Sequence, residues 1–287
     1  MSERRVSIVW ALLAAALYAI SSPVSKVLLG DVSPTMMAAL LYLGAGLGML
    51  LLGVIRRQAG LGASEQRLTR KDLPYTVGMI VLDIAAPICL MAGLATTTSA
   101  NASLLNNFEI VATSLIALLV FREAISRRLW IAIGLITLSS LILSFEDASS
   151  LSFSSGSLLV LAACVCWGFE NNCTRMMSQS DPLEIVVLKG FGSGLGSLAI
   201  AFAVGESLPA LPYVLGSLLL GFLAYGLSIF LYVYAQRQLG AAKTSAYYAI
   251  APFIGTGLSL VLFHTWPEPS FWVALAIMAA GAYLAAE

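Results

Sequence analysis

Apolar runs of about 20 residues recur along the whole chain, separated by short polar breaks. A helix of that length crosses the hydrocarbon core of a bilayer, which is roughly 30 Å thick. The composition agrees, because 59% of the residues are hydrophobic and only 10% are charged. The sequence therefore predicts an all-α, polytopic membrane protein whose main partner is the lipid bilayer.

Ten apolar runs can be delimited, and each is expected to form a transmembrane helix. They are residues 6–29, 33–55, 73–94, 99–121, 127–144, 154–178, 183–204, 211–235, 242–264 and 269–286. Arg4-Arg5 followed by an apolar segment also fits a secretory signal, but the first run is long and lacks a small-x-small cleavage site. We therefore interpret it as the first span.

The basic residues indicate how the chain is oriented, because Lys and Arg concentrate in cytoplasmic segments. With the N-terminus inside, nearly all of the 15 Lys and Arg residues fall in inner segments, whereas Lys26 lies outside and Lys189 lies within a span. This asymmetry predicts that both termini are cytoplasmic.

The second half of the sequence repeats features of the first at nearly constant offsets. The corresponding positions pair Tyr18 with Trp167, Lys26 with Arg175, Pro34 with Pro182, Gly44 with Gly192, and Pro74 with Pro212. Residues 1–148 and 149–287 are thus expected to form two five-helix repeats within one transport domain. Because five is odd, the repeats must insert in opposite orientations. Inverted repeats place a binding site near the membrane midplane and operate by alternating access.

The run 99–121 carries polar residues near its middle. At helical spacing, Ala102, Asn106, Glu109 and Thr113 share one face. A carboxylate is costly in hydrocarbon, so such residues usually face protein groups or a water-filled cavity. Asn106 and Glu109 are therefore candidate substrate-binding residues, and Glu109 would bind an ammonium group or carry a proton. The alternative is a structural carboxylate that is hydrogen-bonded to neighbouring helices.

A similar small and polar stripe recurs in the run 242–264, at Thr244, Tyr248, Ala251 and Gly255. Two such helices facing each other would enclose a cavity. Tyr248 is a further candidate substrate-binding residue because it lies on this stripe.

Other spans also contain candidate substrate-binding residues. Asp83 lies within the run 73–94, and the run 154–178 offers Trp167 and Asn171 on one face, with Glu170 adjacent. Amides there can hold a polar ligand, with Trp167 as an apolar wall, or they can join helices to one another. Lys189 is expected to extend toward the cytoplasm from its position early in its helix.

Catalytic and cofactor motifs are missing from the sequence. There is one histidine, and no H-E-x-x-H, G-x-S-x-G or G-x-x-x-x-G-K-[ST] pattern occurs. The four cysteines all lie inside predicted spans, where small packing residues are expected, and the net charge of zero provides no basic face for nucleic acid. We therefore predict a non-enzyme without metal or cofactor and without a nucleic-acid partner.

The two halves, the Trp167-Gly168 pair with Arg175, and Phe121-Arg122-Glu123 before Gly134 resemble the EamA family of the drug/metabolite transporter superfamily. The resemblance covers essentially the whole chain. It implies a ten-helix exporter in the bacterial inner membrane with a central cavity between inverted halves. Within the family, the chain looks most like the exporters of aromatic and other neutral amino acids.

Together, these features predict a secondary exporter of small metabolites, most directly amino acids with aromatic or other apolar side chains. The scarcity of Lys and Arg in the spans argues against sugar phosphates and nucleotide sugars, which need cationic partners. Proton coupling through Glu109 or Asp83 is left open, as is the oligomeric state. The alternatives are an exporter of organic cations or drugs and, further away, a membrane-embedded enzyme or sensor.

Overall fold

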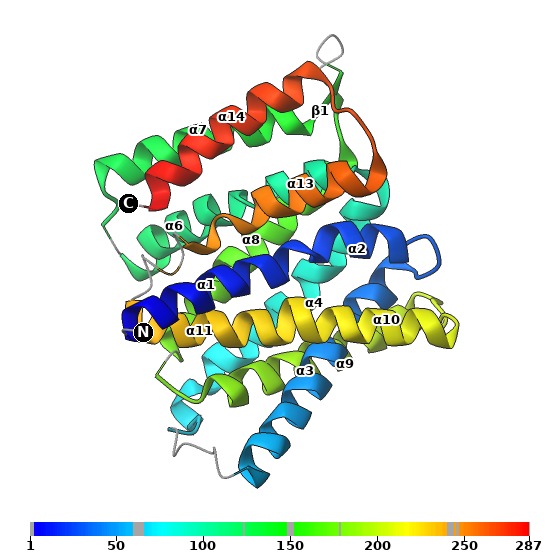
Figure 1. The fold of residues 1–287 in the computed structure, drawn as a ribbon, viewed down its shortest axis with the longest axis vertical. Coiled ribbons are helices and arrows are strands. Elements are labelled where there is room, and N and C mark those ends of the chain that lie inside the picture. Colours follow the sequence, from blue (N-terminus) through cyan, green and yellow to red (C-terminus); the bar gives the residue numbers. More distant parts are fainter. Residues whose placement is uncertain are drawn as a thin grey trace.

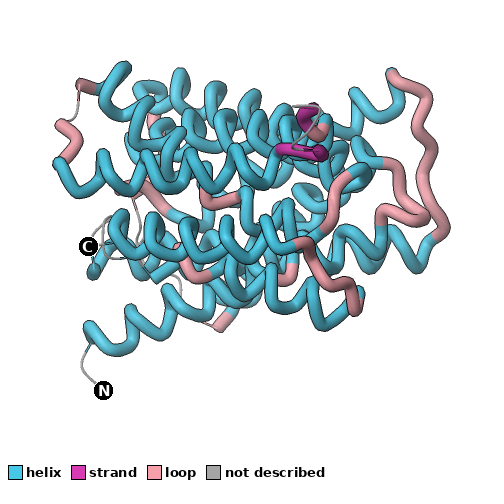
Figure 2. The backbone as a smooth tube through the Cα atoms, turned by 90° about the horizontal axis from the view of Figure 1, so that it is seen from above, coloured by secondary structure: helices cyan, strands magenta, loops and turns pink. Residues whose placement is uncertain are grey.

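The computed structural model describes residues 3–59, 66–122, 124–147, 152–177, 179–239, 244 and 247–286. These residues form a helical bundle whose elements run roughly alongside one another (Figure 1). Viewed from above, the connecting loops gather at the ends of the helices (Figure 2).

The N-terminal part of the bundle, up to the link at residues 148–151, is formed by short and long helices. They are α1 (Glu3–Ala19), α2 (Ser21–Leu28), α3 (Pro34–Gln58), the 3-10 helix η1 (Arg70–Asp72), α4 (Leu73–Thr96), α5 (Ser99–Leu105), α6 (Phe108–Phe121) and α7 (Arg127–Ser144).

The C-terminal part is also built from short and long helices. It contains α8 (Ser155–Met176), α9 (Pro182–Ala203), α10 (Leu211–Gly221), the π-helix η2 (Phe222–Leu227), α11 (Ser228–Leu239), α13 (Ala251–Phe263) and α14 (Pro269–Ala286). Between the two parts, β1 (Phe145–Asp147) and β2 (Ser152–Phe153) form a short antiparallel pair in which Phe145 stacks on Phe153.

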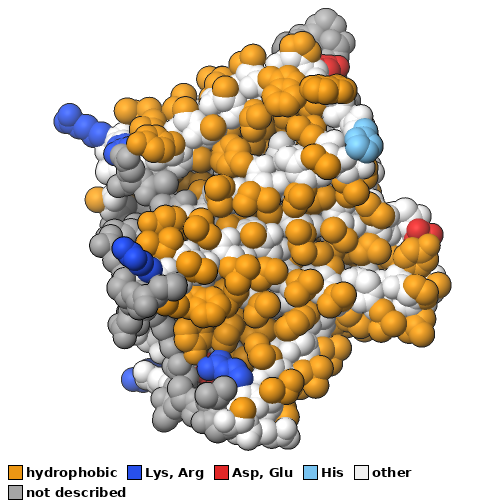
Figure 3. All heavy atoms as spheres, viewed as in Figure 1, with side chains coloured by type: hydrophobic (Ala, Val, Ile, Leu, Met, Phe, Trp, Pro, Cys, Tyr) orange, Lys and Arg blue, Asp and Glu red, His pale blue; other side chains and the backbone are white. Residues whose placement is uncertain are grey.

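Seven helical stretches in the described residues are long and apolar enough to cross a membrane. They are Arg5–Leu28, Pro34–Gln58, Arg70–Thr96, Ser99–Val120, Arg127–Ser144, Pro182–Ala203 and Leu211–Ala235, and two shorter apolar helices are Ala251–Phe263 and Pro269–Ala285. Helix α8 has 22 residues, but its second half is polar. Orange apolar side chains cover most of the visible face (Figure 3), as expected for a polytopic membrane protein.

Local sequence explains where several helices begin. Prolines stand at the first or second position of α3, α4, α9 and α10, where a missing N–H costs nothing. Ser126 and Ser154 cap α7 and α8, since their side chains accept hydrogen bonds from the backbone N–H groups of Leu129 and Ser157.

Four of the expected spans are interrupted within the described residues, which the sequence did not predict. The first breaks at Ile20, and the run 99–121 breaks at Asn106 and Asn107. The run 211–235 contains η2, and the run 242–264 has a turn at Ala249 and Ile250 before α13. At the second break, the Asn107 side-chain amide donates to Leu104 O at 3.3 Å, which competes with the helical backbone pattern. Irregular backbone in a membrane is tolerated where it is buried in protein or lines a polar cavity.

Helices from the N-terminal part pack directly against helices from the C-terminal part. The most extensive contacts join α4 with α8, α3 with α9, α7 with α14, and α1 with α11. Glycine allows the α3–α9 contact, because a Cβ added at Gly190 would lie 2.4 Å from the Gly46 backbone nitrogen. The main apolar core therefore lies between the two parts, around α3, α4, α5 and α8.

Candidate functional site

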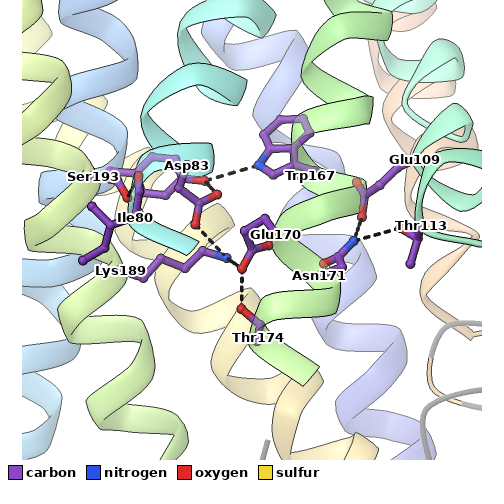
Figure 4. A network of polar contacts seen from close by, with 11 residues as sticks. Ile80, Asp83, Glu109, Thr113, Trp167, Glu170, Asn171, Thr174, Lys189 and Ser193 are labelled. Atoms are coloured by element: carbon purple, nitrogen blue, oxygen red, sulfur yellow. Dashed lines mark hydrogen bonds and ion pairs between the residues drawn. The ribbon is translucent and has the colours of Figure 1, made fainter. Parts of the chain in front are cut away.

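A buried ion cluster joins the three helices α4, α8 and α9 (Figure 4). Lys189 Nζ on α9 lies 3.1 Å from Asp83 Oδ2 on α4 and 2.9 Å from Glu170 Oε1 on α8. Asp83 is fully buried, and the Glu170 and Lys189 residues are 2% and 6% exposed. Glu170 Oε1 also accepts a hydrogen bond from the Thr174 hydroxyl, one turn along α8. We call Asp83, Glu170 and Lys189 the ion cluster.

The position of Lys189 corrects the sequence-based expectation that its side chain extends toward the cytoplasm. Its ammonium group instead points inward between two carboxylates (Figure 4). Asp83 and Glu170 lie on the two neighbouring helices α4 and α8. Their negative charges compensate the Lys189 ammonium group, which would otherwise have to reach the polar membrane surface. The sequence contained all three residues, but only the packing of α4, α8 and α9 brings them together.

A chain of hydrogen bonds links the ion cluster to two aromatic side chains. Trp167 Nε1 donates to Tyr42 OH at 3.4 Å, and Tyr42 OH donates to Asp83 Oδ1 at 2.8 Å. Trp167, predicted as an apolar wall, is 6% exposed and also acts as a polar donor. Tyr42 was missed in the sequence because its run otherwise contains small and apolar residues.

A second polar group lies on the other side of α8. Asn171 Nδ2 donates to Glu109 Oε1 at 2.6 Å and to Thr113 Oγ1 at 3.3 Å, so it bridges α8 and α6 (Figure 4). Glu109 and Thr113 therefore share one face, as their spacing predicts. Asn171, Glu109 and Thr113 are all half-buried. Glu109 thus keeps accessible surface although it lies near the middle of the run 99–121.

The helix break at Asn106 and Asn107 lies directly before α6, and Glu109 is the second residue of α6. There, Glu109 N donates to Asn106 O at 3.1 Å, a tighter spacing than in an α-helix. The Asn106 side chain is 6% exposed and its Oδ1 lies 4.0 Å from Cys164 Sγ, so the structure places Asn106 against α8. The predicted stripe is therefore divided at this break, with Asn106 packed and Glu109 partly accessible.

Tyrosine rings form a cluster between α1, α3, η2 and α11. The Tyr18 ring lies 5.9 Å from the Tyr225 ring and 5.7 Å from the Tyr248 ring. Tyr42 and Tyr232 extend this cluster, at 5.4 Å from Tyr225 and 5.0 Å from Tyr248. Tyr18, Tyr225 and Tyr248 all lie within electrostatic range of the Glu109 carboxylate. The cluster therefore places aromatic faces near an acidic group.

The cavity expected between the two repeated stripes is not found where α5 meets α13. Ser99 Oγ and Ser259 Oγ are 2.8 Å apart, and a Cβ added at Gly255 would lie 3.1 Å from Ser103 Oγ. Small residues on both helices let the backbones approach closely, so these parts of the stripes pack together. The polar residues that keep accessible surface lie further along, at Glu109 and Tyr248.

Two other features of the described residues limit where a ligand site can lie. A groove of about 390 Å³ between α3 and α10 is lined only by glycine, leucine, isoleucine and phenylalanine, so it offers a polar ligand no partner. The described residues contain no group of three or more His, Cys, Asp or Glu side chains that could hold a metal ion. The polar groups of α6, α8 and α9 are therefore the best candidates.

Comparison with known proteins identifies the family. The model of the EamA-like transporter family matches residues 5–145 and 154–286. The chain belongs to the EamA-like transporter family. The family and the apolar helices together make this chain a multi-pass membrane transporter.

Individual relatives agree with the family assignment. An uncharacterized transporter of Methanothermobacter thermautotrophicus is 26% identical over 267 residues, covering 85% of this chain and 76% of the relative. The uncharacterized transporter YyaM of Bacillus subtilis is 21% identical over 241 residues, covering 80% of this chain and 77% of YyaM. A crystal structure with 19% sequence identity matches with a TM-score of 0.69, over 98% of this chain and 95% of that one, which shows a shared fold.

Proposed function

We propose that this transporter exports small amphipathic metabolites across the bacterial cytoplasmic membrane by alternating access, and that amino acids with aromatic or other apolar side chains are its substrates. One observation carries the proposal. A half-buried carboxylate, Glu109, lies midway along an interrupted membrane helix, bonded to Asn171 and within electrostatic range of three tyrosines.

The chemistry of these groups fits an amino acid. Glu109 Oε1 already accepts from Asn171, and among the described residues no side chain donates to its second oxygen, which leaves it available to an ammonium group. The tyrosine rings offer apolar faces for a side chain and a quadrupole that attracts cations. The half-buried Tyr248 hydroxyl, 3.4 Å from Ser228 Oγ, adds a polar tip within this wall.

Three observations support ten spans arranged as two inverted repeats, residues 1–148 and 149–287. The family model matches twice, once in each half. Helices α6 and α13 both end at a phenylalanine followed by a residue with positive φ, 56° at Arg122 and 49° at His264. Finally, α4 packs on α8 and α11 packs on α1. In the proposed repeats α4 corresponds to α10–α11, and α1–α2 correspond to α8, so each contact is the twofold counterpart of the other.

The arrangement of the chain ends supports cytoplasmic termini. The start of α1 and the end of α14 lie at the same end of the bundle (Figure 1). The Lys and Arg side chains visible in Figure 3 gather at that end as well. Basic residues concentrate on the cytoplasmic side of membrane proteins, which favours this end as the cytoplasmic one.

Counterflow of labelled phenylalanine into liposomes that hold the purified protein tests this function. We expect uptake by the parent, competition by unlabelled tyrosine, and loss of uptake in Glu109→Gln, which removes the charge but keeps the shape. Glu184→Gln is the matched control, because Glu184 lies elsewhere and accepts from the Leu68 backbone N–H. Absence of amino-acid uptake in folded parent protein would refute this substrate class.

The charge inventory favours organic cations as a second candidate. The described polar groups of the site contain three carboxylates, Asp83, Glu109 and Glu170, and one ammonium group, Lys189. This surplus of negative charge attracts a cation that lacks a carboxylate more strongly than it attracts a zwitterion. Counterflow of labelled tetraphenylphosphonium, inhibited by unlabelled cation and unaffected by phenylalanine, would favour this candidate.

A further inference from the structure

The negative and positive charges of the ion cluster do not balance. Two carboxylates share one ammonium group, so the cluster has one net negative charge when all three groups are ionised. The side chains of Asp83, Glu170 and Lys189 are 0%, 3% and 7% exposed. A net charge on groups that are this deeply buried has a high free-energy cost, and binding one proton removes that charge.

The two carboxylates differ in their remaining capacity for a proton. In Asp83, Oδ1 accepts from Tyr42, whereas the buried Oδ2 has no hydrogen-bond donor among the described residues and lies 3.1 Å from Lys189 Nζ as an ion pair. In Glu170, Oε1 faces Lys189 and accepts from Thr174, whereas no described residue bonds to Oε2. A proton on Glu170 Oε2 therefore breaks no existing contact, but a proton on Asp83 displaces one.

The remaining titratable groups around the ion cluster do not neutralise it. Tyr42 on α3 donates to Asp83, and Tyr225 on η2 lies within electrostatic range of Asp83. Cys166 and Cys173 lie along α8, and Glu109 on α6 lies across α8 from the cluster. Phenols and thiols are neutral at physiological pH, and a carboxylate adds negative charge. The surroundings therefore increase the tendency of the cluster to take up a proton.

Helix α8 connects the ion cluster to the proposed substrate group. Glu170 and Asn171 are adjacent residues, so one turn of α8 holds both Lys189 and Glu109, through Glu170 and Asn171 respectively (Figure 4). Neutralising Glu170 weakens its attraction to α9, and any resulting shift of α8 moves the Asn171 amide relative to Glu109. The two sites are thereby mechanically linked.

We propose that Glu170 is a proton-exchange site that couples transport to a proton gradient, with Lys189 and Asp83 as its charge partners. The coupling step rests on the proposed transport function. Proton binding by Glu170 does not, so it can be measured without any substrate.

Infrared difference spectroscopy of the full protein in lipid, recorded from alkaline to acidic buffer, measures proton binding directly. We expect a protonated-carboxyl C=O band that is lost in Glu170→Gln and retained in the control Glu184→Gln. In Asp83→Asn the band should appear only at lower pH, because one carboxylate then faces one ammonium group. A band that is unchanged in Glu170→Gln, with Asp83→Asn leaving the pH of its appearance unaltered, would overturn the proposal.

The coupling step is tested by counterflow of labelled phenylalanine and of labelled tetraphenylphosphonium, with equal pH on both sides and with a pH gradient. We expect the gradient to accelerate transport of one probe by the parent and by the control Glu184→Gln. In Glu170→Gln, the ratio of the transport rate with the gradient to the rate at equal pH should fall to about one, whatever its rate at equal pH. Coupling would be overturned if the pH gradient does not change the transport rate of the parent, or if it still accelerates transport by Glu170→Gln. If the parent moves neither probe, the transport proposal fails, while the infrared result still decides whether Glu170 exchanges a proton.

Discussion

Replacing Lys189 by methionine tests the ion cluster most severely. The substitution keeps the length and most of the volume of the side chain but removes the only ammonium group that contacts Asp83 and Glu170 among the described residues. Two buried carboxylates then face each other without compensation. We expect a loss in the free energy of unfolding at neutral pH.

The magnitude follows from the burial of the three groups. Removing one partner of a buried ion pair costs about 3 to 5 kcal/mol, because an uncompensated charge remains inside the protein. Here one ammonium group serves two carboxylates, which places the expected loss at the upper end of that range. Lowering the pH protonates the carboxylates, so the deficit of the variant should shrink in acid.

Thermal unfolding in detergent, followed by circular dichroism at neutral and acidic pH, measures the loss. The matched control is the triple variant Asp83→Asn, Glu170→Gln, Lys189→Met, which keeps the shape of the cluster but carries no charge. It should recover most of the stability, since neutral groups of similar volume replace a buried ionic cluster at little cost. A single variant as stable as the parent, at every pH, would refute the reasoning.

Other substitutions test the packing and the hydrogen bonds. Gly221→Ala should destabilise the protein by about 1 to 3 kcal/mol in a thermal unfolding assay, because the added Cβ would lie 2.0 Å from Leu41 O, whereas Gly257→Ala, with nothing within 4 Å, should be neutral or stabilising. Tyr225→Phe should cost about 1 kcal/mol in the same assay, because it removes the hydroxyl that accepts a buried 2.9 Å hydrogen bond and leaves the ring in place. Lys26→Met should accelerate hydrogen exchange at the end of α4, whose carbonyl groups and following loop the lysine now holds through three hydrogen bonds, and unchanged exchange would contradict that role.

Several features followed from the sequence because they depend on local properties. Hydrophobic runs and prolines located the helices closely, so the expected run 73–94 became α4 at Leu73–Thr96 and the run 127–144 became α7 at Arg127–Ser144. The spacing of Glu109 and Thr113 placed both on one helix face, where Asn171 contacts both. Helix faces, and helix length where the span is unbroken, depend on residues close in the chain, so sequence alone determined them.

The assembly of the site depended on the tertiary structure. Nothing local distinguishes a lysine that extends to the membrane surface from one that lies between two carboxylates, because the difference is which helices flank α9. The breaks at Ile20 and at Asn106 and Asn107 also arise where helices from both parts of the chain meet. Burial and charge compensation are properties of groups that are distant in sequence, and only packing brings them together.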